Sequence, residues 1–221
     1  MELLLYVLLA VPLAAQPLQK VPGEQVRSDD AQVANFHRVD IGKPGVILYR
    51  SASPVRPFIK KPPPHPRAKA DAVMRHLHAL GIRTIVSLED PGDPKKNGKV
   101  ARSVRLEKEA AKDVGIRFAA DPMRNARFKT MTDAQITAWL EKVKKSLFAA
   151  AKRGPVLYHC AAGHDRTGLV TAYLRVTEQG WTAGRAVAEM RRYGHNWKKF
   201  SSDGGKSSWH EDYLRKHFPG K

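Results

Sequence analysis

The residues most suited to chemistry gather between positions 156 and 170. Cys160 is the single cysteine of the chain, and five residues separate it from Arg166. This stretch reads VLYHCAAGHDRTGLV, which predicts a strand ending at His159, a short loop and a helix from about Thr167. A loop that leads into a helix N-terminus directs several backbone N–H groups at one point, where they and the helix dipole bind an anion. The segment therefore predicts a phosphate cradle with a thiol at its base.

Each side chain of this loop fits a phosphate-transfer reaction. The field that binds an anion also stabilises a thiolate, so Cys160 is expected to have a lowered pKa and to act as the nucleophile. Arg166 offers a planar fork of donors that can contact two phosphate oxygens. The Thr167 hydroxyl can donate to the sulfur, His159 is expected to orient the loop, and Gly163 allows a positive φ or a close approach of the anion. The expected phosphate-binding residues are Ala161, Ala162, Gly163, His164, Asp165 and Arg166.

The alternative interpretation is an inert, buried cysteine near the start of a helix. A cysteine followed by an arginine six positions later is by itself a weak pattern. Here it is combined with a histidine before the cysteine, a glycine three positions after it and Thr-Gly after the arginine. The combination favours the reactive thiol.

The stretch 159–168, HCAAGHDRTG, resembles the signature of the protein tyrosine phosphatase superfamily, and within it the small dual-specificity-like branch that includes bacterial members. Segments 35–54, 80–90 and 115–123 resemble the same branch, so the likeness covers roughly residues 33–192. The resemblance implies a two-step mechanism through a phosphocysteine, with an acid that protonates the leaving oxygen and water that completes the hydrolysis. It implies neither a metal nor a cofactor.

The general acid is the part of this pattern that the sequence leaves open. In the family that this sequence resembles, the general acid is an aspartate on a loop. That loop follows the strand that here reads GIRFA, so Asp121 is the first candidate. Asp165, inside the cradle, is the second, and its alternative role is to orient the loop. Asp90 and Asp93 are the third option, although their setting is typical of turns. General-acid assistance contributes about 10²–10⁴ in rate, so a displaced acid leaves a slow enzyme.

The expected substrate is a phosphate monoester of the protein-tyrosine or dual-specificity kind. The alternative within this class is a polyphosphorylated small molecule, either an inositol phosphate or a phosphoinositide, because the chain is strongly basic. It carries 39 Lys and Arg against 21 Asp and Glu, a formal net charge of +18, and such a field favours anionic partners, an anionic surface among them. Two other classes remain: a rhodanese-like sulfurtransferase, disfavoured by the RTG ending, and a non-catalytic phosphate-binding module.

Further basic residues surround the predicted site. His164 can add charge to the rim at mildly acidic pH or simply face solvent. Arg124, Arg127 and Lys129 can bind a second phosphate or form a solvated loop. The tail from position 193 mixes aromatic and basic residues, for which helix packing is preferred over nucleic-acid binding.

The elements that must position the loop alternate along the chain. Strands are expected at 33–39, 45–50, 82–88, 116–120 and 155–159, and helices at 68–80, 99–114, 132–152, 167–178, 182–193 and 208–217. Thr132 and Gln135 predict a capping box. Segment 60–66 is proline-rich and predicts an extended loop. The pattern predicts an α/β fold with a central, mostly parallel twisted sheet of four to five strands flanked by helices.

The chain length of 221 residues fits one domain. Residues 1–15 read as a signal peptide or an uncleaved N-terminal anchor, 16–32 as a linker and 33–221 as a single phosphatase domain. We expect a secreted or periplasmic bacterial protein, and a monomer. A single cysteine excludes an intramolecular disulfide.

Overall fold

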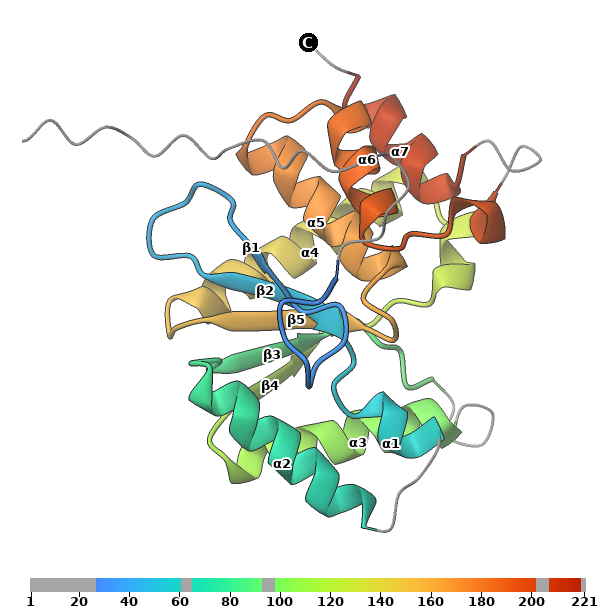
Figure 1. Cartoon of the computed structure of the whole chain (residues 1–221). Helices are drawn as coiled ribbons and strands as arrows, with labels where there is room; N and C mark the ends of the chain where they lie inside the picture. Colours follow the sequence, from blue (N-terminus) through green and yellow to red (C-terminus); the bar gives the residue numbers. More distant parts are fainter. Residues whose placement is uncertain (1–26, 61–64, 93–97, 202–206, 220–221) are drawn as a thin grey trace, which may run out of the picture.

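The sheet that carries the site has five strands. The computed structural model describes residues 27–60, 65–92, 98–201 and 207–219. The spatial strand order is β1-β2-β5-β3-β4, with β1 antiparallel to β2 and the other pairs parallel (Figure 1). The mostly parallel sheet was predicted. The strands are β1 (His37–Val39), β2 (Leu48–Ala52), β3 (Thr84–Ser87), β4 (Arg117–Ala120) and β5 (Val156–Cys160).

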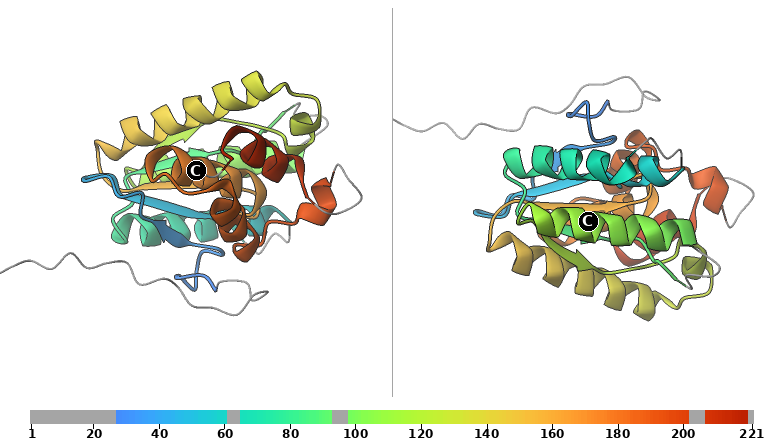
Figure 2. Two further views of the ribbon diagram at one scale, coloured as in Figure 1. Left: turned by 90° about the horizontal axis from the view of Figure 1, so that it is seen from above. Right: turned by 90° about the horizontal axis from the view of Figure 1, so that it is seen from below.

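Helices cover both faces of this sheet. In Figure 1, α1, α2 and α3 lie on one side and α4, α5, α6 and α7 on the other, and Figure 2 shows the same layers from above and below. The α-helices are α1 (Arg56–Lys60), α2 (Pro66–Ala79), α3 (Gly98–Asp113), α4 (Asp133–Ala151), α5 (Asp165–Glu178), α6 (Ala183–Arg192) and α7 (Trp209–His217). Two 3₁₀ helices, η1 (Asn125–Lys129) and η2 (Trp197–Phe200), complete the described elements.

Local sequence accounts for most of these boundaries. The capping box at the start of α4 is present: Thr132 accepts from the backbone of Gln135, whose side chain accepts from the backbone of Thr132. Two predictions were wrong in detail. The helix after the phosphate loop begins at Asp165, two residues earlier than expected, and the short helix α1 was not predicted. The tail packs as helices, with Tyr213 and Leu214 of α7 buried.

The strand before the loop sends alternate side chains to opposite faces of the sheet. Every residue of β5 is buried. Tyr158 and Cys160 pack with the core under α4 to α7, whereas Leu157 packs with the core under α2 and α3. Because the side-chain period of a strand is two, His159 faces the second layer while the thiol faces the first. This alternation fixes which helices can reach each of the two residues.

The candidate site lies at the carboxyl edge of the parallel strands. Cys160 ends β5, the central strand, and is paired in register with Ala52 at the end of β2. Loops that leave neighbouring strands meet at this edge, which is where open α/β sheets place ligands. Among the described residues, no helix is both long and apolar enough to cross a bilayer. The leader prediction and most of the linker prediction concern residues 1–26, which lie outside the described ranges.

Candidate active site

The thiol of Cys160 sits in a buried position at the start of the loop, with 3% of the residue exposed. Burial by itself raises the pKa of this thiol. The nearby Arg166 guanidinium and hydrogen bonds from the hydroxyl and backbone N–H of Thr167 outweigh that effect, so the pKa of Cys160 lies below its ordinary value. The Thr167 hydroxyl is buried and makes no other hydrogen bond in the described chain. Residue 160 therefore provides a thiolate at lower pH than a free cysteine.

Arg166 is anchored at one nitrogen and unpartnered at another. Its Nη1 donates to the carbonyl oxygens of Leu88 and Met123, both at 2.8 Å, which lie just beyond β3 and β4. Its Nε is buried and has no partner among the residues that the structure describes. A buried, unsatisfied N–H of a cation is costly unless a ligand completes it. The guanidinium thus has the geometry of a clamp that is held from behind and open toward an anion.

Gly163 allows the loop to pass under the end of β2. Its φ is +71°, a region that glycine adopts without strain. A Cβ at this position would lie 2.6 Å from the backbone carbonyl of Ser51 and 2.7 Å from the nitrogen of Ala52. Both neighbours are backbone atoms of a sheet strand and cannot move aside. The loop therefore requires glycine here for conformation and for space.

Three consecutive carbonyl groups of the loop are held on its outer side. The backbone N–H of Ser53 donates to the carbonyl of Ala161 at 3.4 Å. The side-chain amide of Asn35 donates to the carbonyls of Ala162 and Gly163 at 3.3 and 2.9 Å. In a trans peptide the N–H points opposite to the C=O. The N–H groups of residues 162, 163 and 164 are thereby turned to the inner side, as an anion cradle requires.

A buried arginine supports the same turn. Arg50, at 0% exposure, donates from Nη2 to the carbonyl of Gly163 at 2.5 Å. Its guanidinium lies 4.4 Å from the ring centre of Tyr193. A cation enclosed behind the cradle adds to the positive field at the anion position. Asn35 and Arg50 lie in the segment that resembles the phosphatase branch, but no role could be predicted for them, because the groups they contact are more than 100 residues away.

His159 contacts the opposite layer, as the alternation of β5 dictates. Its Nε2 lies 2.9 Å from a carboxylate oxygen of Glu107 on α3, with both side chains buried, and its Nδ1 lies 3.4 Å from the carbonyl oxygen of Cys160. Burial alone would lower the pKa of His159, but the charges of Glu107 and Glu89 raise it to about 9. An imidazolium therefore sits directly behind the nucleophile and ties the strand end to α3.

This pair predicts a pH dependence of stability. Because the folded-state pKa of His159 lies above the ordinary value of 6.5, its contribution is complete below pH 6.5 and is lost as the pH rises through about 9. The free energy of unfolding of the wild type should fall across this window. In Glu107→Gln the fall should be smaller, because the main charge that raises the pKa is gone. Urea unfolding between pH 6 and 9.5 measures this, and parallel curves for the two proteins would refute it.

Asp121, the first candidate acid, is engaged elsewhere. It follows β4 and is buried, and its Oδ1 lies 3.1 Å from Nζ of Lys142 on α4. Its carbonyl accepts from the indole nitrogen of Trp139 at 3.2 Å. The loop that follows Asp121 contacts the site through a backbone group, because the carbonyl of Met123 accepts a hydrogen bond from Arg166. The structure thus gives the Asp121 carboxylate a lysine partner and gives the site a neighbouring carbonyl.

Asp165, the second candidate, belongs to a buried polar chain. Its Oδ1 lies 2.7 Å from Nδ1 of His195, and Nε2 of that ring lies 2.8 Å from the Ser208 hydroxyl at the N-cap of α7. Burial raises the pKa of Asp165, but the His195 contact outweighs it, so the pKa lies below its ordinary value. The charge of Asp165 also acts on the thiol of Cys160 and opposes its ionisation. The Asp165 carboxylate therefore lies within electrostatic reach of the nucleophile.

The remaining candidates around the site have structural partners. Asp90 accepts from the backbone N–H of Gly92 at 2.8 Å and pairs with Nε of Arg124 at 2.6 Å, which is a turn-forming role, and Asp93 lies outside the described residues. Arg127 and Lys129 are exposed on η1. Burial lowers the pKa of His164, which favours its neutral form. No group of three or more metal-ligating side chains is clustered in the described ranges.

Comparison with known proteins places this geometry among phosphatases. A family model described as "Tyrosine phosphatase family" matches residues 64–177. The dual specificity protein phosphatase TpbA of Pseudomonas aeruginosa (strain UCBPP-PA14) is 28% identical over 194 residues, which cover 88% of this chain and 72% of the relative. A protein tyrosine phosphatase domain-containing protein 1 of Mus musculus is 33% identical over 122 residues, 54% of this chain and 16% of the relative.

Solved structures show the same fold. The crystal structure of Pseudomonas aeruginosa TpbA matches with a TM-score of 0.52 and 24% identity, over 88% of this chain and 91% of that one. A kinase associated phosphatase, in which the catalytic site cysteine is substituted by serine, matches with a TM-score of 0.53 and 17% identity, over 84% and 96% of the two chains. The five-stranded sheet with its flanking helices is thus a known phosphatase architecture.

Proposed function

Because the chain belongs to the tyrosine phosphatase family, we propose that Cys160 is the nucleophile of a two-step phosphate monoester hydrolysis. In the first step a sulfur–phosphorus bond forms and the ester oxygen leaves with a proton. In the second step water attacks phosphorus, the sulfur–phosphorus bond breaks and orthophosphate is released. The observation that carries the proposal is a thiol of lowered pKa beside a buried guanidinium whose Nε has no partner in the described chain.

Arg166 holds the transferred group in this scheme. Two of its hydrogen bonds are committed to backbone carbonyls, which fixes the plane of the guanidinium. The remaining donors can follow negative charge as it develops on the equatorial phosphate oxygens. The inward-turned N–H groups of the loop and the N-terminus of α5 bind the same oxygens. These groups need no movement during the reaction, so the site is preorganised for the transition state.

We infer that Asp165, together with His195, handles the proton of the leaving group. Both carboxylates have a neighbour, Lys142 for Asp121 and His195 for Asp165, so these contacts do not separate them. Asp165 lies in the loop itself, and its charge acts on the Cys160 thiol. A phosphate dianion in the cradle disfavours a second negative charge beside it and so raises the pKa of the Asp165 carboxyl, which in the free site lies below its ordinary value. The ionised carboxylate left after the first step can then accept a proton from the attacking water.

Leaving-group dependence distinguishes the two aspartates. Phenolate needs protonation to leave, whereas p-nitrophenolate leaves with little help. We expect Asp165→Asn to lower kcat for phenyl phosphate by about 10²–10³ and to lower it far less for p-nitrophenyl phosphate. The matched variant Asp121→Asn should affect the two substrates equally. If instead Asp121→Asn alone shows the leaving-group dependence, Asp121 is the acid and the role proposed for Asp165 is wrong.

We propose a phosphorylated protein, and not a small molecule, as the substrate. The matching relatives are named as dual specificity or tyrosine phosphatases, which supports this choice. The basic character of the chain is equally compatible with an inositol phosphate or phosphoinositide. A screen that follows orthophosphate release from phosphotyrosine and phosphoserine peptides and from inositol phosphates separates these classes. Release from inositol phosphates alone would overturn the assignment.

A further inference from the structure

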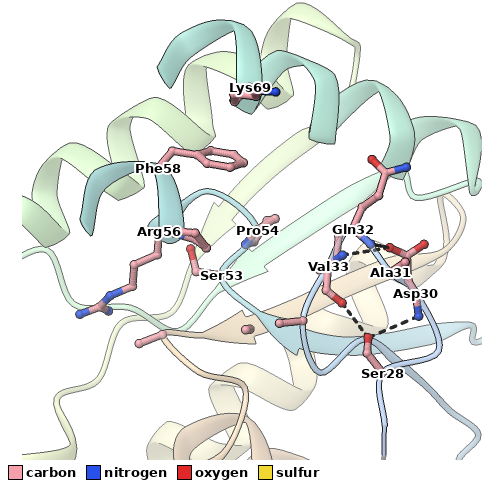
Figure 3. Close-up of a pocket in the computed structure, with 14 residues that line it drawn as sticks. Ser28, Asp30, Ala31, Gln32, Val33, Ser53, Pro54, Arg56, Phe58 and Lys69 are labelled. Carbon is pink, nitrogen blue, oxygen red and sulfur yellow. Dashed lines mark hydrogen bonds between the residues drawn. The ribbon is translucent and has the colours of Figure 1, made fainter. Parts of the chain in front are cut away.

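A large pocket opens directly beside the phosphate loop. It has a volume of about 980 Å³, and Ala161, the residue after the nucleophile, forms part of its wall. The other walls come from segment 28–34, from segment 52–58 and from Lys69 of α2. Figure 3 shows Phe58 and Arg56 on one side of it, Val33 and Asp30 on the other, and Lys69 above. A group attached to a phosphate in the cradle would have this space next to it.

The wall formed by segment 28–34 is held in place by its own hydrogen bonds. One carboxylate oxygen of Asp30 accepts from the backbone N–H groups of Gln32 and Val33 at 2.7 and 2.9 Å. The other lies 2.7 Å from Nε2 of His76 on α2. The Ser28 hydroxyl donates to the carbonyl of Val33 at 2.7 Å. The pocket is therefore bounded by an anchored segment on this side and preformed before a ligand arrives.

The opposite wall is apolar. Pro54 is buried, Pro57 is exposed and Phe58 is half-buried, packing against the core under α2 and α3. Contact between this surface and an apolar group is favourable by about 25 cal/mol for each Å² of apolar area removed from water. A polyphosphorylated cyclitol carries almost no apolar surface to bury here. A peptide side chain does.

Among the described residues that line the pocket, Lys69 is the one cation without an ion-pair partner. Nη1 of Arg56 is neutralised by Glu89 at 2.7 Å, and Asp30 is occupied by His76. Lys69 is exposed, and its ammonium group has no ion-pair partner in the part of the chain that the structure describes. The remaining charge complements a carboxylate. Together with the apolar wall, it defines a ligand that is apolar at one point and acidic at another.

We propose that this pocket binds the peptide segment next to the phosphorylated residue of a protein substrate, with an apolar side chain against Phe58 and an acidic one near Lys69. The inference rests on the proposed phosphatase function and names its substrate class. Ala161, which follows Cys160, forms part of the pocket wall, so the chain that carries a phosphate in the cradle can extend into the pocket. Selectivity for sequence around the phosphate then comes from residues that take no part in the chemical step.

The test compares phosphotyrosine peptides with p-nitrophenyl phosphate. A peptide set that carries a glutamate at each position within three residues of the phosphotyrosine, and a matched set with lysine there, is assayed by orthophosphate release. The wild type should prefer glutamate at one or two positions. Lys69→Glu should reverse that preference, by about fivefold in kcat/KM. Phe58→Ala should lower the ratio of peptide to p-nitrophenyl phosphate kcat/KM by about tenfold.

Lys152→Glu is the matched control. Lys152 is also exposed, but it ends α4 just before β5 begins, at the edge of the sheet opposite Cys160. It should leave the peptide preference unchanged. Equal preference for both peptide sets in the wild type, or a Lys69→Glu enzyme with the wild-type preference, would overturn the proposal while the hydrolysis of p-nitrophenyl phosphate still supports the function. If the wild-type protein hydrolysed neither the peptides nor p-nitrophenyl phosphate, the proposed phosphatase function itself would be wrong.

Discussion

Cys160→Ser is expected to reduce kcat for p-nitrophenyl phosphate by about 10⁴-fold or more, the scale seen when a catalytic nucleophile is removed. The physical reason is ionisation. The site lowers the pKa of the thiol through Arg166 and Thr167, and that field cannot ionise a hydroxyl of far higher pKa at neutral pH. The measurement is steady-state orthophosphate release, with rapid quenching of the wild type to trap the phosphocysteine.

The cradle itself should survive this substitution. The backbone N–H groups and Arg166 are unchanged, so the variant should still bind tungstate or orthophosphate by calorimetry. Cys160 is the single cysteine, which allows a second check. Iodoacetamide should inactivate the wild type by labelling one residue, and bound phosphate should protect it. A serine variant that hydrolyses substrate at the wild-type rate would show that the covalent mechanism is incorrect.

Arg166→Lys is expected to lower kcat/KM by about 10³-fold, although the charge is retained. Nη1 donates to the carbonyls of Leu88 and Met123, while Nε has no partner among the described residues and is left for the anion. A lysine has one nitrogen and cannot keep both sets of contacts. Loss of one preorganised donor at a developing oxyanion lowers kcat by about 10²–10³-fold. Misplacement of the phosphoryl group lowers the rate further.

A second substitution separates charge from geometry at this position. Arg166→Met removes the largest influence that lowers the pKa of Cys160, so the midpoint of the pH dependence of its alkylation should move upward. In Arg166→Lys that midpoint should move less, because a cation remains. Arg185→Lys is the control, since Arg185 is exposed on α6 and stacks on Trp181. Activity of Arg166→Lys close to that of the wild type would contradict a bidentate clamp.

The proposed nucleophile and clamp could be found in the sequence because they lie within one short segment. The strand, the turn and the helix N-terminus that build the cradle are adjacent along the chain from Val156 onward, so local preferences nearly suffice to place Cys160 and Arg166 together. Most helix limits were predicted to within about two residues, because amphipathic periods and caps are local. The capping box at Thr132 is an example.

The acid could not be predicted because its role depends on distant partners. Along the sequence Asp121 ranks as the first candidate and Asp165 as the second, because Asp121 follows the strand 116–120. The tertiary structure places Lys142 beside the first and His195 beside the second. The supports of the cradle were missed for the same reason, since Asn35, just before β1, and Arg50, on β2, both donate to the carbonyl of Gly163.

A thiol, a guanidinium and a turning glycine at spacings that predict an anion cradle can be identified from the sequence alone. How that cradle is held, which charges lie behind it and what space opens next to it depend on contacts between distant segments. The reason is the range of the forces involved. Backbone preferences act over a few residues, whereas burial, ion pairing and pocket shape arise when segments far apart in the chain are packed together.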